Sequence, residues 1–344
     1  MTSSGSASLT GLQRTLNFVA GKAIDRTPCH PIVMRWAARQ ADIRYRDFVL
    51  NPTAKCDANI YCAETFGFDW VTVLSDPYTE AEAFGLRVEY PEDNLPMDVG
   101  GHLPDAASVA KLSPYNPRHH PRCRNRIREI EEYRQRVGDT HFIVGWIEGP
   151  VAEYADLRGA GAAALDLLDE PDSVSAAMDI IVEAAREFAG LQVKAGAHCI
   201  GIGDAFCSQI GPALYREFAF EREKELIAQI HSLGALVKLH ICGNTTSILS
   251  EMIATGADII DVDHLVSSMA PFAALLAPHQ VFAGKADPVS VIQEGSHDII
   301  AKTVRRDILE AGGRCIISAG CEITPGTSLD NMSVFCKTAE QSIP

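Results

Sequence analysis

The residues with the clearest metal-binding chemistry are one histidine and two cysteines. His240 and Cys242 stand two positions apart in the segment LHICG, and Cys321 occurs much later, in SAGCE. One imidazole nitrogen and two thiolates are ligands that zinc prefers, and three protein ligands leave a coordination position open for chemistry. The pattern predicts a catalytic zinc site. The alternative is a buried histidine with two core cysteines.

The spacing also indicates how these side chains meet. His240 and Cys242 point to the same side of an extended chain, because residues i and i+2 share a face. Asp263 is the candidate fourth ligand, since it follows the next apolar run of the sequence. Asp261 and His264 are its rivals: Asp261 is expected to share a face with Asp263, and His264 to face away. An outward-facing or capping aspartate is the alternative.

The elements that must position these residues are short apolar runs that alternate with helical patterns such as Pro212–Leu233. Several runs are nearly continuous in Val, Ile and Leu, as expected for parallel strands buried on both faces. Alternation of this kind predicts an α/β fold, namely a (β/α)8 TIM barrel. The runs are Pro31–Met34, Trp70–Leu74, His141–Gly145, Cys199–Ile202, Leu236–Leu239, Asp258–Val262, Val281–Ala283 and Cys315–Ser318.

Two stretches lie outside a bare barrel. Residues 1–28 are expected to form an N-terminal helical extension, and residues 85–137 a long insertion after the second strand, with a late helix near Asn125–Val137. Within it, Arg122–Arg136 alternates basic and acidic residues, which is typical of a solvated helix face. No internal repeat is visible, so residues 1–344 are expected to form a single domain.

Further candidates follow other strands, because catalytic side chains of such barrels come from the C-terminal strand ends. Asp204 and Asp76 are catalytic candidates that would orient a substrate amine or handle its proton. Arg35 and Arg39 would bind a carboxylate or phosphate of the substrate, and Glu148 is a third substrate-binding candidate. The alternatives are capping or turn formation for the aspartates, and surface or salt-bridged positions for the arginines.

Composition excludes several classes of protein. The 344 residues are 47% hydrophobic and carry a formal net charge of −15, which argues against nucleic acid and against an anionic membrane surface. No signal peptide is visible, and no apolar run reaches the roughly twenty residues that span a bilayer. The ten cysteines are scattered, so we expect reduced thiols and a cytoplasmic protein.

The chain resembles the uroporphyrinogen decarboxylase superfamily over nearly its whole length. Residues 34–39, MRWAAR, are similar to the decarboxylase motif MRQAGR, and residues 74–76, LSD, to its FSD segment. Residues 320–327, GCEITPGT, resemble GHGI followed by PxTP. The resemblance implies a (β/α)8 barrel. The sequence departs from the decarboxylases at Trp36, which replaces Gln, and at Cys321, which replaces the GHGI histidine.

The decarboxylases need no metal, whereas His240, Cys242 and Cys321 resemble the ligand set of the zinc-dependent methyltransferase branch, which includes the methylcobamide:coenzyme M methyltransferases. That resemblance implies zinc held by His240, Cys242 and Cys321, with Asp263 at the position of an acidic fourth ligand. It further implies methyl transfer between a corrinoid carried by a partner protein and a small-molecule donor or acceptor. Asp204 and Asp76 would orient the substrate or manage its proton. Members of the family often form homodimers.

Two other functions remain open from the residues. A metal-free decarboxylase of tetrapyrrole acetates would use Arg35, Arg39 and Asp76, but the His-x-Cys pair and Cys321 oppose it. A non-catalytic protein that binds a corrinoid or tetrapyrrole on the same barrel is the third possibility. The methyl donor and acceptor are not specified by the sequence.

Overall fold

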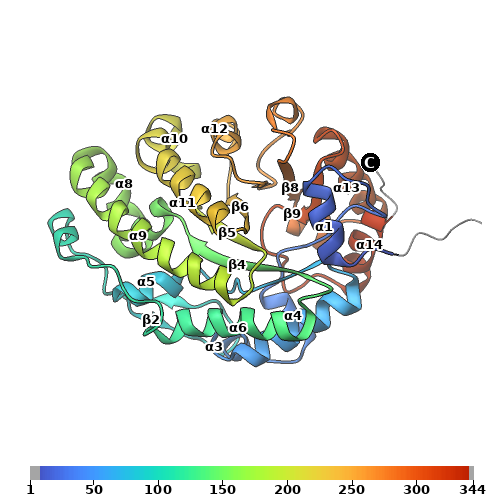
Figure 1. The fold of residues 1–344 in the computed structure, drawn as a ribbon, viewed down its shortest axis with the longest axis horizontal. Coiled ribbons are helices and arrows are strands. Elements are labelled where there is room, and N and C mark those ends of the chain that lie inside the picture. Colours follow the sequence, from blue (N-terminus) through green and yellow to red (C-terminus); the bar gives the residue numbers. More distant parts are fainter. Residues whose placement is uncertain (1–7, 341–344) are drawn as a thin grey trace, which may run out of the picture.

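A curled parallel sheet ringed by helices forms the core of the computed structural model, which describes residues 8–340 (Figure 1). Its strands are hydrogen-bonded in the order β1-β4-β5-β6-β7-β8-β9. Most strand residues are buried on both faces, as the continuous apolar runs predicted. The strands are β1 (Trp70–Thr72), β4 (Phe142–Glu148), β5 (Cys199–Gly203), β6 (Leu236–Ile241), β7 (Ile259–Val262), β8 (Val281–Ala286) and β9 (Cys315–Ala319).

The eighth position of the barrel is an extended segment rather than a regular strand. Cys29 and Ile32 form isolated parallel bridges with Ile317 and Glu322. On the other side, the amide of Asp69 donates to the carbonyl oxygen of Cys29 at 2.9 Å. Pro28 and Pro31 have no N–H to give to a ladder, which explains why the expected strand Pro31–Met34 is replaced by single bridges that begin earlier. The predicted (β/α)8 barrel class is confirmed.

Helices cover the outside of the sheet and fill the loops. Contacts with the strands are made by α4, α6, α9, α11 and α13. The predicted helix Pro212–Leu233 is confirmed: Gly211, with φ 76°, interrupts α10 (Cys207–Leu214) just before Pro212, and the chain then stays helical through a π-helical stretch, η2 (Tyr215–Phe220), and α11 to Ser232. The outer helices are α4 (Pro52–Phe66), α6 (Pro121–Val137), α9 (Pro171–Ala195), α11 (Glu221–Ser232), α12 (Leu249–Ala254), α13 (His297–Glu310) and α14 (Leu329–Glu340).

Shorter helices follow the strand ends. They are α2 (Arg35–Gln40), α3 (Tyr45–Leu50), α5 (Tyr78–Phe84), α7 (Pro150–Arg158), α8 (Ala160–Asp169), α10 (Cys207–Leu214), η3 (Ala273–Leu275) and η4 (Pro288–Gln293). Because the carboxyl ends of parallel strands meet at one end of a barrel, these segments surround its mouth. No helix among residues 8–340 is long and apolar enough to cross a membrane.

The N-terminal extension contains one helix, α1 (Gly11–Val19), which begins at a Thr10 capping box. Phe18 and Val19 pack into one buried cluster with Trp70 and Phe142 and with further side chains from β4 to β9. These strand residues alternate along each strand, so they face the barrel interior. Helix α1 therefore covers the floor of the barrel. Residues 1–7 of the expected extension lie outside the described part of the chain.

A buried carboxylate ties this floor together. Asp69 is 1% exposed and pairs with Arg14 and, at 2.8 Å, with Arg26. Its Oδ2 also accepts the amide hydrogen of Cys29 at 2.7 Å. Removing one partner of such a network leaves buried charge without compensation.

Replacing Asp69 by alanine is therefore expected to lower the free energy of unfolding by about 3–5 kcal/mol, measured by urea denaturation. Asp57→Ala is the matched control, because Asp57 pairs with Arg136 at 2.7 Å while its side chain is 59% exposed. The control is expected to cost less than about 1 kcal/mol. Equal losses in the two variants would contradict this account of the barrel floor.

The insertion after β1 and α5 forms a small antiparallel pair, β2 (Val88–Glu89) with β3 (Met97–Asp98), then a 3-10 turn, η1 (Ala106–Lys111), and α6. Helix α6 begins at Pro121, earlier than the expected Asn125. The predicted solvated face of this helix is wrong in part. Arg122, Arg126 and Glu129 are 4%, 1% and 0% exposed, because they pair with buried groups of α4 and of the loop after β1 instead of solvent.

Candidate metal centre and surrounding site

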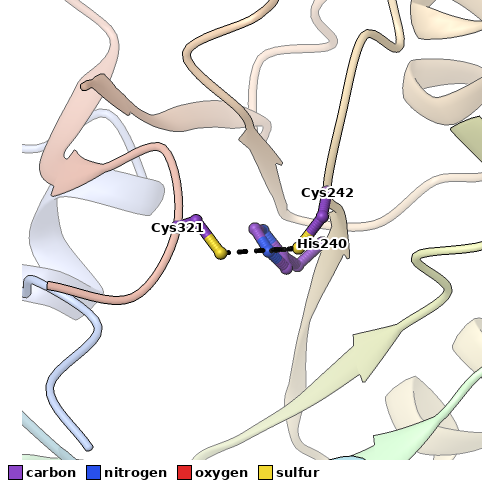
Figure 2. A group of neighbouring side chains, drawn as sticks. All are labelled: His240, Cys242 and Cys321. Carbon is purple, nitrogen blue, oxygen red and sulfur yellow. Dashed lines mark hydrogen bonds between the residues drawn. The ribbon is translucent and has the colours of Figure 1, made fainter. Parts of the chain in front are cut away.

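Three side chains from opposite parts of the barrel mouth converge on one point (Figure 2). His240 lies in β6, Cys242 follows it directly, and Cys321 lies in the loop after β9. The distance from His240 Nε2 to Cys242 Sγ is 3.0 Å, and from Cys242 Sγ to Cys321 Sγ 3.7 Å. Ligand atoms of all three lie within 4.8 Å of one another. One nitrogen and two sulfurs at this spacing fit the donor set of a zinc ion with an open position.

A carboxylate behind His240 fixes the orientation of the imidazole. His240 pairs in register with Asp261 of β7, and His240 Nδ1 lies 3.0 Å from Asp261 Oδ2. The same carboxylate lies 2.7 Å from Lys238 Nζ. Burial lowers the pKa of His240, but the charge of Asp261 outweighs it and raises that pKa to about 9. With Nδ1 directed at Asp261, Nε2 is left to face the two sulfurs.

The two thiols share one negative charge. A hydrogen bond from Cys242, helped by His240 and opposed by burial, lowers the pKa of Cys321 to about 4. The same hydrogen bond and burial raise the pKa of Cys242 well above its ordinary value. Without a cation one thiolate is thus favoured over two, and a divalent cation supplies the charge that lets both lose their protons. The other eight cysteines are free and buried.

Asp263 lies outside the group of three. Its Oδ2 accepts the amide hydrogen of Gly243 at 3.0 Å, and its Oδ1 accepts that of Leu265 at 2.9 Å. Gly243 has φ 94°, a left-handed conformation that glycine adopts without strain. The carboxylate therefore holds the turn that carries Cys242. Its rival His264 lies 2.9 Å from Asp263 Oδ1 through Nδ1, while Asp261 supports His240 from behind.

The two catalytic candidates are buried and bonded to other groups of the protein. Asp204 is 0% exposed, and its Oδ1 accepts the amide hydrogen of Ala152 at 2.6 Å at the start of α7. Burial, opposed by these hydrogen bonds, raises its pKa to about 6. Asp76 is 2% exposed and lies 2.5 Å from Arg122 Nη2. Burial opposes ionisation, but Arg122 and Arg126 lower the pKa of Asp76 to about 2. The structure brings neither carboxylate to the metal group.

Arg35 and Arg39 line a cavity of about 570 Å³ on the Cys321 side of the mouth. The Arg35 guanidinium lies 3.3 Å from both carboxylate oxygens of Glu322, and its amide donates to the same residue at 3.0 Å. Arg39 Nη1 donates to the carbonyl oxygen of Pro325 at 3.1 Å. Both arginines therefore hold the loop that carries Cys321.

Glu148 lines a second cavity, of about 330 Å³, at the ends of β4 and β5. Trp146 Nε1 donates to Glu148 Oε1 at 2.8 Å, and the centroid of the Trp146 ring is 6.3 Å from that of His240. Asp98 and Asp156 line the same cavity. Sequence reasoning missed both, because they follow no strand and come from the insertion and from α7.

Asp156 predicts a pH dependence of stability. Burial, followed by repulsion from Glu80 and other carboxylates, raises the pKa of Asp156 to about 8. In the unfolded chain this group loses its proton near its ordinary pKa of about 4. Between these values the folded protein holds a proton that the unfolded chain has released, so the contribution of Asp156 to stability is greatest at low pH and declines as pH rises towards 8.

Asp156→Asn is expected to flatten that decline, since each unit of raised pKa corresponds to about 1.4 kcal/mol. Urea denaturation of both proteins at several values from about pH 5 to about pH 8 measures the slope. Parallel slopes for the variant and the natural chain would contradict the assigned role of Asp156.

Comparison with known proteins places this barrel in one family. Residues 10–342 match the uroporphyrinogen decarboxylase (URO-D) family. The chain is 30% identical over 338 residues to the methylcobamide:CoM methyltransferase MtaA of Methanosarcina barkeri, covering 95% of this chain and 97% of that protein. It is 25% identical to uroporphyrinogen decarboxylase of Synechococcus sp. (strain CC9902), covering 94% and 95%. The chain belongs to the uroporphyrinogen decarboxylase family.

Solved structures show the same fold. A methyltransferase from Methanosarcina mazei superposes with a TM-score of 0.87 at 22% identity, covering 97% of this chain and 99% of that one. A B12-independent methionine synthase from Shewanella sp. W3-18-1 superposes with a TM-score of 0.56 at 12% identity, covering 84% and 87%.

Proposed function

We propose that this protein is a zinc-dependent methyltransferase that moves a methyl group between a corrinoid protein and a small substrate. The observation that carries the proposal is the convergence of His240, Cys242 and Cys321 within 4.8 Å at the barrel mouth. The similarity to MtaA, named a methylcobamide:CoM methyltransferase, supports the same reaction class and a corrinoid co-substrate.

The residues around the site fit this chemistry. His240, Cys242 and Cys321 would hold the zinc ion, which when bound lowers the pKa of a substrate thiol and polarises a substrate oxygen or nitrogen. Asp261 keeps His240 Nε2 directed at the sulfurs, and Asp263 holds the turn of Cys242. We propose this positioning role for Asp263 in place of direct ligation.

The remaining candidates take supporting roles in the proposal. Arg35 and Arg39 position the Cys321 loop, and Asp204 and Asp76 stabilise the walls of the mouth. Glu148 faces the substrate. The partner that delivers or accepts the methyl group carries the corrinoid, and docks where the strand ends open.

A metal-free decarboxylase is the second candidate, since decarboxylases of the family match nearly the whole chain. That activity would use Arg35, Arg39 and Asp76 to bind the tetrapyrrole. In this chain all three side chains already bind internal groups, namely Glu322, the carbonyl oxygen of Pro325 and Arg122. The proposed methyltransferase uses the group of three, which the decarboxylase leaves without a role.

Incubation of zinc-loaded protein with methylcob(III)alamin and a panel of small thiols tests the proposal. Methyl transfer to a thiol converts methyl-cobalt(III) to cobalt(I) and forms a thioether, and both products can be followed by absorbance and mass spectrometry. Loss of this activity on chelation and its return with zinc are expected. A parallel incubation uses uroporphyrinogen as the substrate. Stepwise decarboxylation of uroporphyrinogen, together with no methyl transfer from methylcob(III)alamin, would favour the metal-free decarboxylase. Tight binding of the corrinoid, without turnover in either of these two incubations, would favour a non-catalytic binding protein.

A further inference from the structure

We propose that the small substrate carries a positively charged amino group, which binds in the acidic cavity beside Trp146. This inference rests on the proposed function, because it concerns the molecule that reaches the metal centre. The cavity of about 330 Å³ is lined by three carboxylates and two aromatic side chains, together with one histidine: Asp98, Glu148, Asp156, Tyr78, Phe206 and His102.

The carboxylates of this cavity have few hydrogen-bond donors around them. Glu148 is 6% exposed, and among the described residues only Trp146 donates to its carboxylate, at Oε1. No residue of the described range 8–340 donates a hydrogen bond to the Asp156 carboxylate. Asp98 alone has a compensating group, since its Oδ1 lies 3.1 Å from His102 Nε2. Buried carboxylate oxygens without donors are costly, and an ammonium group with its N–H donors would satisfy them.

Further carboxyl groups lie behind the wall, and each adds negative charge when it is ionised. Glu80 and Glu153 are 3% and 1% exposed, and Glu80 Oε2 and both Glu153 oxygens have no partner among the described residues. Arg126 offsets this charge in part, but its Nη2 donates to the carbonyl oxygen of Asp76. Burial and mutual repulsion raise the pKa of Glu148 and of Glu153 well above ordinary values. A bound cation relieves this repulsion, whereas an anion would increase it.

The aromatic lining favours the same ligand. Tyr78 and Phe206 line the cavity together with the carboxylates, and aromatic faces attract ammonium groups through their quadrupole. The basic cavity on the Cys321 side differs, because Arg35 and Arg39 are already hydrogen-bonded to the loop that they hold. Of these two cavities, the acidic one therefore has more polar groups free to bind a ligand.

One molecule can reach both the cavity and the metal group. Glu148 pairs in register with Gly203, and Gly203 pairs in register with His240. Glu148 and His240 therefore lie at the same height of the barrel, two strands apart, with about 10 Å between their backbones. A side chain at position 203 would meet Trp146 at 2.7 Å and Glu148 at 3.1 Å. The glycine leaves that space to the Trp146 ring and the Glu148 carboxylate, which extend the wall towards His240.

Thiols of matched length test the charge preference. The probes are aminopropanethiol, mercaptopropanol and mercaptopropanesulfonate, and thiol binding is read from the sulfur-to-cobalt absorption of cobalt(II)-substituted protein. We expect the aminothiol to bind at least about tenfold more tightly than the alcohol, and the sulfonate to bind most weakly. Asp156→Asn and Glu148→Gln are each expected to reduce that preference at least threefold. Asp93→Asn, the same change in the basic cavity, is expected to leave it unaltered.

A second titration separates this inference from the proposed function. Metal-free protein is titrated calorimetrically with propylammonium and with propanol, and we expect only the ammonium to bind, and to lose affinity in Asp156→Asn. Thiols that bind the metal without charge preference, or propylammonium binding unchanged by Asp156→Asn, would overturn the amine site while leaving the metal chemistry intact. A third outcome is that propylammonium binding depends on Asp156 but no thiol binds to cobalt. That outcome would support the amine site and contradict the proposed thiol chemistry.

Discussion

Cys321→Ser is expected to weaken zinc binding by about a hundredfold or more and to abolish methyl transfer. Zinc held by four ligands gains about 10–16 kcal/mol, so one thiolate contributes about 3 kcal/mol, and a serine hydroxyl stays protonated near neutral pH. Cys321 comes from the loop after β9, while the other two members of the group come from β6 and the turn after it. Its loss leaves a pair that cannot enclose the ion. Competition with a chromophoric chelator measures the affinity.

Cys56→Ser is the matched control for this variant. Cys56 is buried between α4 and α6 and lies outside the group of three, and its thiol donates to the carbonyl oxygen of Glu129 at 3.5 Å, a hydrogen bond that serine can also make. The control should keep its zinc affinity and its activity. Equal zinc affinity in Cys321→Ser and the natural protein would remove Cys321 from the proposed centre.

Asp261→Asn is expected to lower zinc affinity by about 10–100-fold, the usual effect of removing the group that orients a metal-binding histidine. The same variant is expected to lose about 3–5 kcal/mol of stability, because the Lys238 ammonium is left buried without its carboxylate. Zinc competition measures the first effect and urea denaturation of metal-free protein the second.

The double variant Asp261→Asn with Lys238→Met separates these two roles. It removes both buried charges, so most of the lost stability should return, while the zinc affinity should stay low because His240 still lacks its partner. Recovery of zinc affinity together with stability would show that Asp261 acts only on folding and does not orient His240.

The fold could be predicted where the apolar pattern is continuous. Strands β5 to β9 begin within one residue of their predicted starts, because buried parallel strands carry long runs of Val, Ile and Leu. The first strand was predicted from a similar run, but its prolines cannot donate to a ladder and only isolated bridges form. The burial of Arg122 and Arg126 was missed because their partners, Asp76 and its carbonyl group, belong to a distant loop.

The site could be predicted in its chemistry and less in its surroundings. The pair His240 and Cys242 follows from a spacing of two on one strand, and Cys321 from the resemblance and from its place after the last strand. The support of His240 by Asp261 depends on the register of β6 with β7, which no local pattern encodes. The acidic cavity draws Asp98 from β3 of the insertion and Asp156 from α7, so it is visible only after folding.

X-ray absorption at the zinc edge of zinc-loaded protein, prepared without oxygen, tests the central claim most directly. The account predicts one tightly bound zinc ion with two sulfur neighbours at about 2.3 Å and nitrogen or oxygen neighbours at about 2.0–2.2 Å. One of the two sulfurs should disappear from the spectrum of Cys321→Ser. A zinc ion with fewer than two sulfur neighbours, or a natural protein that retains no zinc under these conditions, would contradict it.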